Sequence, residues 1–315
     1  MESHFIYNPA NVGNHCHSPS LTQDQNYIYL AWYAYPEKEH ENAQICVAKK
    51  AKKENSNWET SQIVFEERLH NTQGNPVLFF DPKTQTLHLF FVILKWTYWD
   101  SAKIMHSQWN NVDKCWTRPN SINTPEGVML RHRPLLYDDL ALFPAYDEKT
   151  LTTQYYEAHA PFDHWEMVSQ HDTKTIQADL IELSPNEMIS FMRAAGDHKK
   201  VFRSLSADRG HSWSSVMETT CLCPLSGIAA IKINPQTIIL AHNNTEAHSR
   251  GHLSLSVTHN CGQSFKPPYP LERDGIEVSY PTLLRINDEQ FAIAYTYNRK
   301  MIKFLMMTTQ ELSSL

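Results

Sequence analysis

The sequence predicts an all-β protein, a six-bladed β-propeller that occupies residues 1–315 as one domain. Three observations lead to this prediction. Short apolar runs come in six pairs, and turn residues separate the two runs of a pair. An aromatic residue closes a polar segment at intervals of 48 to 58 residues, a spacing typical of propeller blades. The segment SADRGHSW (206–213) has a second copy, THNCGQSF, at 258–265.

The pairs of apolar runs predict the strands. Each pair predicts an inner strand, a hairpin turn such as Asp81-Pro82 or Asn234-Pro235, and a second strand. The runs cover, in chain order, residues 27–35, with the inner-strand start CHSPSL (16–21) before them; 76–80 and 87–94; 134–137 and 140–146; 179–183 and 188–193; 227–233 and 237–243; 280–286 and 290–297. We expect six four-stranded blades without a linker or a second domain, the last blade completed by N-terminal residues. A two-sheet sandwich is the alternative.

The copied segment predicts a tight turn between two strands. We expect the Asp208 carboxylate to accept backbone N–H bonds, Gly210 to adopt a positive φ, and Trp213 to pack beneath the turn. Weaker copies keep only the closing aromatic. The five closing aromatics are Trp58, Trp116, Trp165, Trp213 and Phe265.

Composition and charge exclude several classes of protein. The chain has 28 Lys and Arg against 34 Asp and Glu, a formal charge of -6 without a basic block, which argues against nucleic acid or an anionic membrane as partner. Its longest apolar run, 87–94, is too short to span a bilayer. The six cysteines are scattered and the N-terminus does not look like a secretory signal, so we expect reduced thiols and a cytoplasmic protein, with signal-independent export as the alternative. No zinc-binding spacing occurs, and we expect neither metal nor cofactor.

Polar side chains gather where a propeller brings strand ends together. The innermost strand of each blade starts at the channel mouth where the second strand ends, so residues at both positions converge there. The inner-strand starts carry His17, Asn75, Arg131, Arg133, Gln177, Ser226 and Tyr280. The second-strand ends carry Glu37, Glu39, Glu41, Trp96, Tyr98, Trp99, Arg193, Asn243, Asn244, Arg250 and Arg299. Guanidinium groups suit a carboxylate and aromatic faces suit sugar rings, although each arginine alone could simply pair with an acid.

These motifs give the chain a resemblance to a known family. SADRGHSW matches the Asp box, S-x-D-x-G-x-[ST]-W, and ordered landmarks run from CHSPSL near the start to VSYPTLLRINDEQFAIAYTY near the end. The sequence therefore resembles the sialidase (neuraminidase) superfamily, and within it the predicted neuraminidases built from bacterial neuraminidase repeats. The resemblance implies a six-bladed propeller with its site on the mouth opposite the Asp boxes.

The resemblance also implies roles for individual residues. Tyr280 in VSYPTL falls at the nucleophilic tyrosine, and Arg193 and Arg250 fall at two of the three arginines that clamp the substrate carboxylate. The first arginine is replaced by His17, and the glutamate that deprotonates the tyrosine is replaced by Gln177.

The sequence leaves open which residues replace the missing base, the third arginine and the acid. Asp179 or Glu277 could be the base that activates Tyr280. Arg131 or Arg133 could complete the clamp, with His17 as hydrogen-bond donor or acid/base. Where the family has an acidic aspartate, this chain offers three glutamates, and we expect Glu37, Glu39 or Glu41 to be the acid.

We therefore expect a sialidase-like exo-glycosidase that needs no cofactor and acts on a terminal sialic acid or uronic acid of a glycan. Asn75, Trp96, Trp99 and Asn244 are expected to contact the sugar beside the arginines. Two alternatives remain open. One is a non-catalytic glycan-binding propeller, and the other is a lyase or hydrolase that uses His17 on a uronate.

Overall fold

The structure is a computed structural model and describes residues 2–53, 56–65, 72–95, 97–273 and 275–313. Strands make up nearly all of its regular structure, which confirms the all-β prediction. The helical elements of the described ranges are a 3-10 helix, η1 (Trp99–Ser101), and one short α-helix, α1 (Thr309–Ser313). No helix in these ranges has the length and apolar character needed to cross a membrane.

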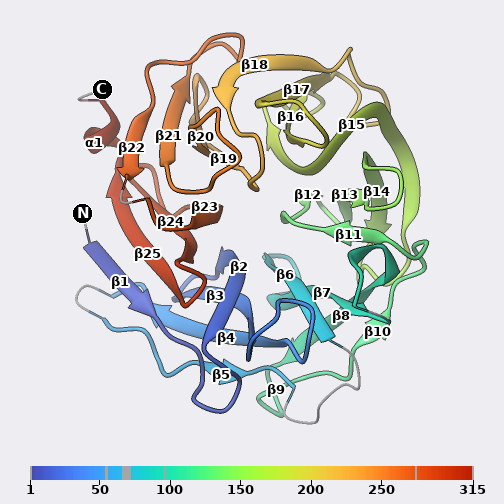
Figure 1. The fold of residues 1–315 in the computed structure, drawn as a ribbon. Helices are drawn as coiled ribbons and strands as arrows, with labels where there is room; N and C mark the ends of the chain where they lie inside the picture. Colours follow the sequence, from blue (N-terminus) through green and yellow to red (C-terminus); the bar gives the residue numbers. More distant parts are fainter. Residues whose placement is uncertain (1, 54–55, 66–71, 96, 274, 314–315) are drawn as a thin grey trace.

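The strands form five hydrogen-bonded sheets within the described residues, placed around a common centre in chain order (Figure 1). The first sheet contains β2 (His15–Gln23), β3 (Tyr27–Tyr35), β4 (Gln44–Ala51) and β5 (Gln62–Ile63). The second contains β6 (Thr72–Asp81), β7 (Thr86–Leu94), β8 (Ala102–Asn110), β9 (Cys115–Trp116) and β10 (Asn120–Ser121). The third contains β11 (Val128–Leu130), β12 (Leu135–Tyr137), β13 (Leu140–Asp147), β14 (Thr152–His159), β15 (Glu166–Glu182), β16 (Met188–Ala194), β17 (Lys200–Ser206) and β18 (Met217–Leu222). The fourth contains β19 (Ala229–Asn234), β20 (Thr237–Asn243), β21 (Leu253–Thr258) and β22 (Tyr269–Glu272). The fifth contains β23 (Val278–Arg285), β24 (Gln290–Tyr297), β25 (Met301–Thr308) and β1 (Glu2–Ile6).

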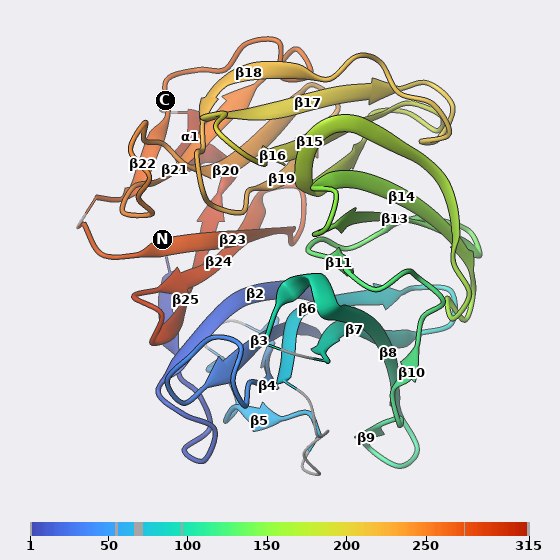
Figure 2. The same ribbon diagram turned by 45° about the vertical axis from the view of Figure 1, so that its right-hand side comes forward.

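Two features join groups of strands along the circle. Strand β15 pairs with β14 through residues 166–174 and with β16 through residues 175–182, so one long strand links two groups (Figure 2). The N-terminal strand β1 pairs antiparallel with β25, with Glu2 opposite Met306 and Ile6 opposite Ile302. As expected, N-terminal residues therefore complete the last sheet.

Aromatic side chains fill the space between neighbouring sheets. Phe90 and Phe143 lie in the core between the second and third sheets, with ring centroids 5.2 Å apart. Burying a side chain of this size stabilises the fold by about 1.5–3 kcal/mol. Each of the five closing aromatics packs against another ring. These pairs are Trp58 with Phe304, Trp116 with Trp109, Trp165 with Phe143, Trp213 with Tyr155, and Phe265 with Phe191.

The turn at 206–213 has the geometry expected from its sequence. The Asp208 carboxylate accepts hydrogen bonds from the backbone N–H and the hydroxyl of Ser212, at 2.8 and 2.5 Å. Gly210 has a φ of 88°, and its N–H donates to the Ser206 hydroxyl at 2.8 Å. The copy at 258–265 repeats the two backbone bonds: the Ser264 N–H donates to Oδ1 of Asn260, and the Gly262 N–H donates to the Thr258 hydroxyl. The repeat in the sequence therefore marks a repeated backbone turn.

Gly210→Ala is expected to lower the free energy of unfolding by about 2–4 kcal/mol. A Cβ at this position would lie 2.7 Å from Cδ2 of Leu142, and the positive φ adds backbone strain. Gly196→Ala is the matched control, because Gly196 has a φ of 95° and no atom within 4 Å of an added Cβ. Urea unfolding measures both variants. An equal loss of unfolding free energy in both variants would show that the contact with Leu142 has no cost.

Candidate functional site

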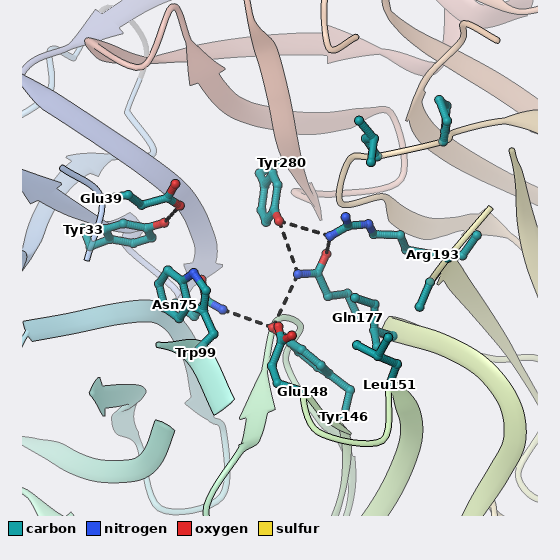
Figure 3. A pocket seen from close by; sticks show the side chains of 16 residues that line it. Tyr33, Glu39, Asn75, Trp99, Tyr146, Glu148, Leu151, Gln177, Arg193 and Tyr280 are labelled. Carbon is teal, nitrogen blue, oxygen red and sulfur yellow. Dashed lines mark hydrogen bonds between the residues drawn. The ribbon is translucent and has the colours of Figure 1, made fainter. Parts of the chain in front are cut away.

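A cavity of about 300 Å³ opens where the inner strands of the sheets converge (Figure 3). Side chains from four of the five sheets and from the loops between them form its wall. The lining residues are Tyr33, Glu39, Asn75, Trp99, Tyr146, Glu148, Leu151, Ile176, Gln177, Arg193, Ala194, Ala195, Gly196, Pro224, Leu225 and Tyr280. This is the region at which the sequence predicted strand ends to meet.

A repeated irregularity of the inner strands carries three of these side chains. Strands β6, β15 and β23 each shift register against the next strand, between Gly74 and Val77 in the case of β6. In each shift one residue has a positive φ: Asn75 (44°), Gln177 (54°) and Tyr280 (55°). A β-bulge re-aims the side chain at that point of the strand. Asn75, Gln177 and Tyr280 therefore face the cavity.

Tyr280, Arg193 and Gln177 form one hydrogen-bonded group in the cavity (Figure 3). Nη1 of Arg193 donates to the Tyr280 hydroxyl oxygen and to Oε1 of Gln177, each at 3.2 Å. Nε2 of Gln177 donates to the hydroxyl oxygens of Tyr280 and Tyr146, each at 3.4 Å. Asn75 donates a second bond to the Tyr146 hydroxyl at 3.2 Å. The Tyr280 oxygen is thus surrounded by donors, which favours its ionised form.

The positive charges of two arginines near Tyr280 act in the same direction. Burial by itself raises the pKa of a phenol, but here Arg193, Arg250 and the Gln177 hydrogen bond outweigh it and the pKa of Tyr280 lies below its ordinary value. The guanidinium carbon of Arg250 lies 5.2 Å from the centre of the Tyr280 ring. Gln177 cannot accept a proton, but it stabilises the phenolate by donating to it.

A chain of ion pairs borders the cavity on the side of Tyr33. Arg250 pairs with Glu277 at 3.2 Å, Glu277 pairs with Arg299 at 2.9 Å, and Arg299 pairs with Glu39 at 2.6 Å. Glu39 also accepts a hydrogen bond from the Tyr33 hydroxyl. Burial raises the pKa of Glu277, but its hydrogen bond from Arg299 and the charges of Arg299 and Arg250 hold it below its ordinary value. Glu277 is therefore held ionised between two arginines.

Comparison with known proteins identifies the family. The model of the BNR repeat-like domain matches residues 26–293, most of the chain. The chain belongs to the BNR repeat-like domain family. No curated protein matches the sequence.

Solved structures show what this BNR repeat-like domain resembles in fold. The Hadza microbial sialidase Hz136 is 15% identical with a TM-score of 0.80, and the match covers 99% of this chain and 69% of that one. A protein of unknown function from Dyadobacter fermentans is 14% identical with a TM-score of 0.79, over 97% of both chains. The leech intramolecular trans-sialidase, complexed with 2,7-anhydro-Neu5Ac, is 12% identical with a TM-score of 0.78, over 99% of this chain and 70% of that one. The resemblance to the sialidase superfamily is confirmed.

Several residues expected at the site contact the cavity and others do not. Tyr280, Arg193, Gln177, Glu39, Asn75 and Trp99 line it. Arg250 lies behind Tyr280, where it pairs with Glu277 and donates to the Leu225 carbonyl at 3.0 Å. Glu37 is exposed, Glu41 pairs with Lys38 at the surface, and Asn244 is outside the lining; these positions correct the expected contacts. Trp96 lies outside the described residues.

His17 and Arg131 are buried beneath the site. The His17 ring packs on the Tyr280 ring, with centroids 4.3 Å apart, and its side chain is 1% exposed. Burial and the surrounding arginines lower the pKa of His17 well below its ordinary value, so this ring is neutral. Arg131 donates to the backbone carbonyls of Pro19, Tyr280 and Pro281 at 2.9–3.0 Å. These positions correct the acid/base role expected for His17 and the clamp role expected for Arg131, because neither side chain reaches the cavity.

Asp179 and Arg133 border a different cavity, of about 710 Å³, which corrects the roles expected for them at Tyr280. Asp179 accepts the N–H of Ala230 at 2.7 Å and lies 3.3 Å from Nδ1 of His132. Burial raises the pKa of Asp179 to about 6, against the opposing effects of the Ala230 N–H and of Arg133.

The raised pKa of Asp179 predicts a dependence of stability on pH. The folded protein holds a proton on this carboxyl between its ordinary pKa of 3.8 and about 6, where the unfolded chain has released it. The contribution of this carboxyl to the free energy of unfolding, read as the difference between wild type and Asp179→Asn, is therefore expected to fall by about 1–3 kcal/mol as the pH rises through this window. Asp179→Asn should remove that fall, whereas Asp288→Asn at an exposed carboxylate should keep it. Urea unfolding across the window measures all three proteins. The same pH dependence in Asp179→Asn and wild type would contradict the prediction.

The residues missed by sequence reasoning are Glu148, Tyr146 and Tyr33. Tyr146 ends the second strand predicted at 140–146, and Glu148 follows that strand. The search of second-strand ends that located Arg193 could therefore have found both residues. Within the described residues, no group of three or more His, Cys, Asp or Glu side chains is arranged to hold a metal ion.

Proposed function

We propose that the protein is a sialidase-like exo-glycosidase that removes a terminal acidic sugar, a sialic acid or a uronic acid, from a glycan. The observation that carries this proposal is the hydrogen bond between Arg193 and the Tyr280 phenol inside a cavity of about 300 Å³. A group that binds anions and a group that attacks carbon meet there. A cavity of this volume is at the small end of ligand pockets, which suits one sugar ring.

Arg193 is the group that would bind the sugar carboxylate. Its Nε is buried and has no hydrogen-bond partner among the described residues. A buried guanidinium with an unused donor is costly unless a ligand supplies the acceptor. A carboxylate satisfies such a donor with a charge-assisted bond.

Tyr280 would attack the anomeric carbon. A phenolate is a suitable nucleophile beside a carboxylate because the two arginines neutralise the combined negative charge. The arginines and Gln177 lower the pKa of Tyr280, which reduces the need for the carboxylate base that Gln177 replaces. Attack by Tyr280 would give a covalent intermediate and retention of configuration.

A glycan-binding propeller without catalysis is the second candidate. Gln177 favours it, because this residue stands where the resemblance places a glutamate base and an amide cannot accept the proton. Catalysis through His17 has no comparable support, since that ring does not line the cavity.

We also infer a single domain of six blades. Supporting this count, β15 pairs with β14 in its first part and with β16 in its second part. Dividing the third sheet within β15 turns five sheets into six groups of strands. The inner strands would then be β2, β6, β11, the second part of β15, β19 and β23.

Hydrolysis assays test the function. We expect the purified protein to release the fluorophore from a fluorogenic sialoside or from one member of a panel of uronosides, and to leave neutral glycosides intact. Glu37→Gln should behave as wild type, because Glu37 is exposed and outside the cavity. Binding on a glycan array without turnover of any substrate would overturn the proposed activity in favour of the glycan-binding candidate.

A further inference from the structure

Two carboxylic acids line the cavity, and their surroundings differ (Figure 3). Glu39 is fully engaged by the protein. One of its oxygens accepts the Tyr33 hydroxyl, and the other pairs with Nη1 of Arg299 at 2.6 Å. Both oxygens of Glu39 are therefore already bonded to protein groups.

Glu148 has no such partners. It follows β13 at the start of the turn to β14, where its backbone N–H donates to the Gly127 carbonyl at 3.0 Å. Its carboxyl group lines the cavity beside Gln177 and Tyr146 and makes no hydrogen bond or ion pair with the described residues.

Burial is the main influence on the protonation of Glu148. Burial raises its pKa above the ordinary value, and the negative charges of Asp147 and Asp100 add to this effect, whereas Arg193 opposes it. The nearby Tyr146 hydroxyl is fully buried, and its pKa lies well above the ordinary range, so it adds no charge. A carboxyl group whose pKa is raised by burial, and which shares a cavity with a nucleophile, has the properties required of a general acid.

We propose that Glu148 is the proton donor of this site and that Glu39 is a positioning residue that holds Arg299 and Tyr33. This assignment rests on the proposed glycosidase function and replaces the expectation that the loop of 37–41 supplies the acid. It also explains why a carboxyl group without a protein partner lines the cavity: its partner is the glycosidic oxygen of the substrate.

The assigned step balances with these two residues and one water molecule. The Glu148 carboxyl transfers its proton to the glycosidic oxygen while the Tyr280 phenolate bonds to the anomeric carbon, and the C–O bond to the leaving alcohol breaks. Water then attacks the anomeric carbon and gives one proton to the Glu148 carboxylate. The bond to Tyr280 breaks, and both residues return to their starting forms.

Substrates that differ only in leaving group test the assignment. A general acid strongly accelerates the departure of a poor leaving group, such as an alcohol. It has little effect on dinitrophenolate, which departs without a proton. Glu148→Gln is expected to lower kcat/KM about 10²- to 10⁴-fold for the alkyl glycoside and far less for the dinitrophenyl glycoside. The matched variant Glu39→Gln should lower kcat/KM by a similar factor for both substrates. In wild type, kcat/KM should fall on the basic side of its pH profile. This fall should disappear in Glu148→Gln and persist in Glu39→Gln.

Chemical rescue gives a second readout. In Glu148→Ala the space of the missing side chain admits azide, which attacks the covalent intermediate without needing a base. We expect azide to accelerate turnover of the dinitrophenyl glycoside and to yield a glycosyl azide of retained configuration. No such product is expected from Glu39→Ala. Thermal unfolding of each variant controls for folding.

The outcomes separate the two proposals. Two results with an active wild type would overturn the assignment of Glu148 alone. One is the same dependence of kcat/KM on the leaving group in Glu148→Gln and Glu39→Gln. The other is the absence of glycosyl azide from Glu148→Ala. A wild type without turnover of any acidic glycoside would overturn both the assignment and the glycosidase function.

Discussion

Tyr280→Phe is expected to lower kcat by about 10³-fold or more while the protein still binds the acidic sugar. The substitution removes only the oxygen that would bond to carbon. The ring, its packing on His17 and its contact with Arg250 remain, so the fold and the carboxylate site should persist. Steady-state kinetics gives kcat, and calorimetric titration with the free sugar gives the affinity.

A spectroscopic titration isolates the reason for this effect. Phenolate absorbs in the near ultraviolet, and the low pKa of Tyr280 should give a phenolate signal at lower pH than that of an ordinary tyrosine. The signal should be missing in Tyr280→Phe and present in Tyr7→Phe, since Tyr7 is 60% exposed and lies outside the cavity lining. Wild-type kcat in Tyr280→Phe would rule out attack by this residue.

Arg193→Met is expected to lower kcat/KM for acidic sugars by about 10²- to 10³-fold. The variant loses the donor to the sugar carboxylate and the positive charge that lowers the pKa of Tyr280, so both KM and kcat should change. Arg193→Lys should recover part of the loss through its charge, but it cannot bond Gln177, Tyr280 and a carboxylate with one planar group.

The control for Arg193 is an arginine with similar chemistry outside the site. Arg285 is partly exposed and pairs with Asp288 at 2.6 Å, so Arg285→Met should leave kcat/KM unchanged. The phenolate titration should shift to higher pH in Arg193→Met and stay in place in Arg285→Met. If Arg193→Met instead hydrolysed acidic sugars at the wild-type rate, Arg193 would not be the carboxylate ligand.

The strands were predictable because their signal is local. Paired apolar runs, turn residues and closing aromatics each depend on a few neighbouring residues, and the structure places strands at the expected runs. Tyr280 and Arg193 were found because the family motif fixes their place along these strands. Gln177 was found by its spacing from Arg193 in the same motif.

The direction of side chains just after the strand starts, such as that of Asp179, was not predictable. A bulge adds one residue and turns the following side chains to the other face of a strand. In β15 this shift lies between Ile176 and Asp179. Gln177 therefore lines the cavity that contains Tyr280, whereas Asp179 lines the separate cavity of about 710 Å³. Ion pairs such as Arg299 with Glu39, which are 260 positions apart, depend on the closed arrangement of the sheets and have no local signal.

The pairing of β1 with β25 also has a consequence for how the chain folds. The paired residues are about three hundred positions apart, so this contact forms only after residues 302–306 have been synthesised. Contacts of such long range carry a large loop-closure entropy and slow the approach to the native state. Joining the two ends through a short linker and opening the chain at an exposed turn should therefore speed assembly of the last sheet and leave the catalytic rate of the circular permutant unchanged.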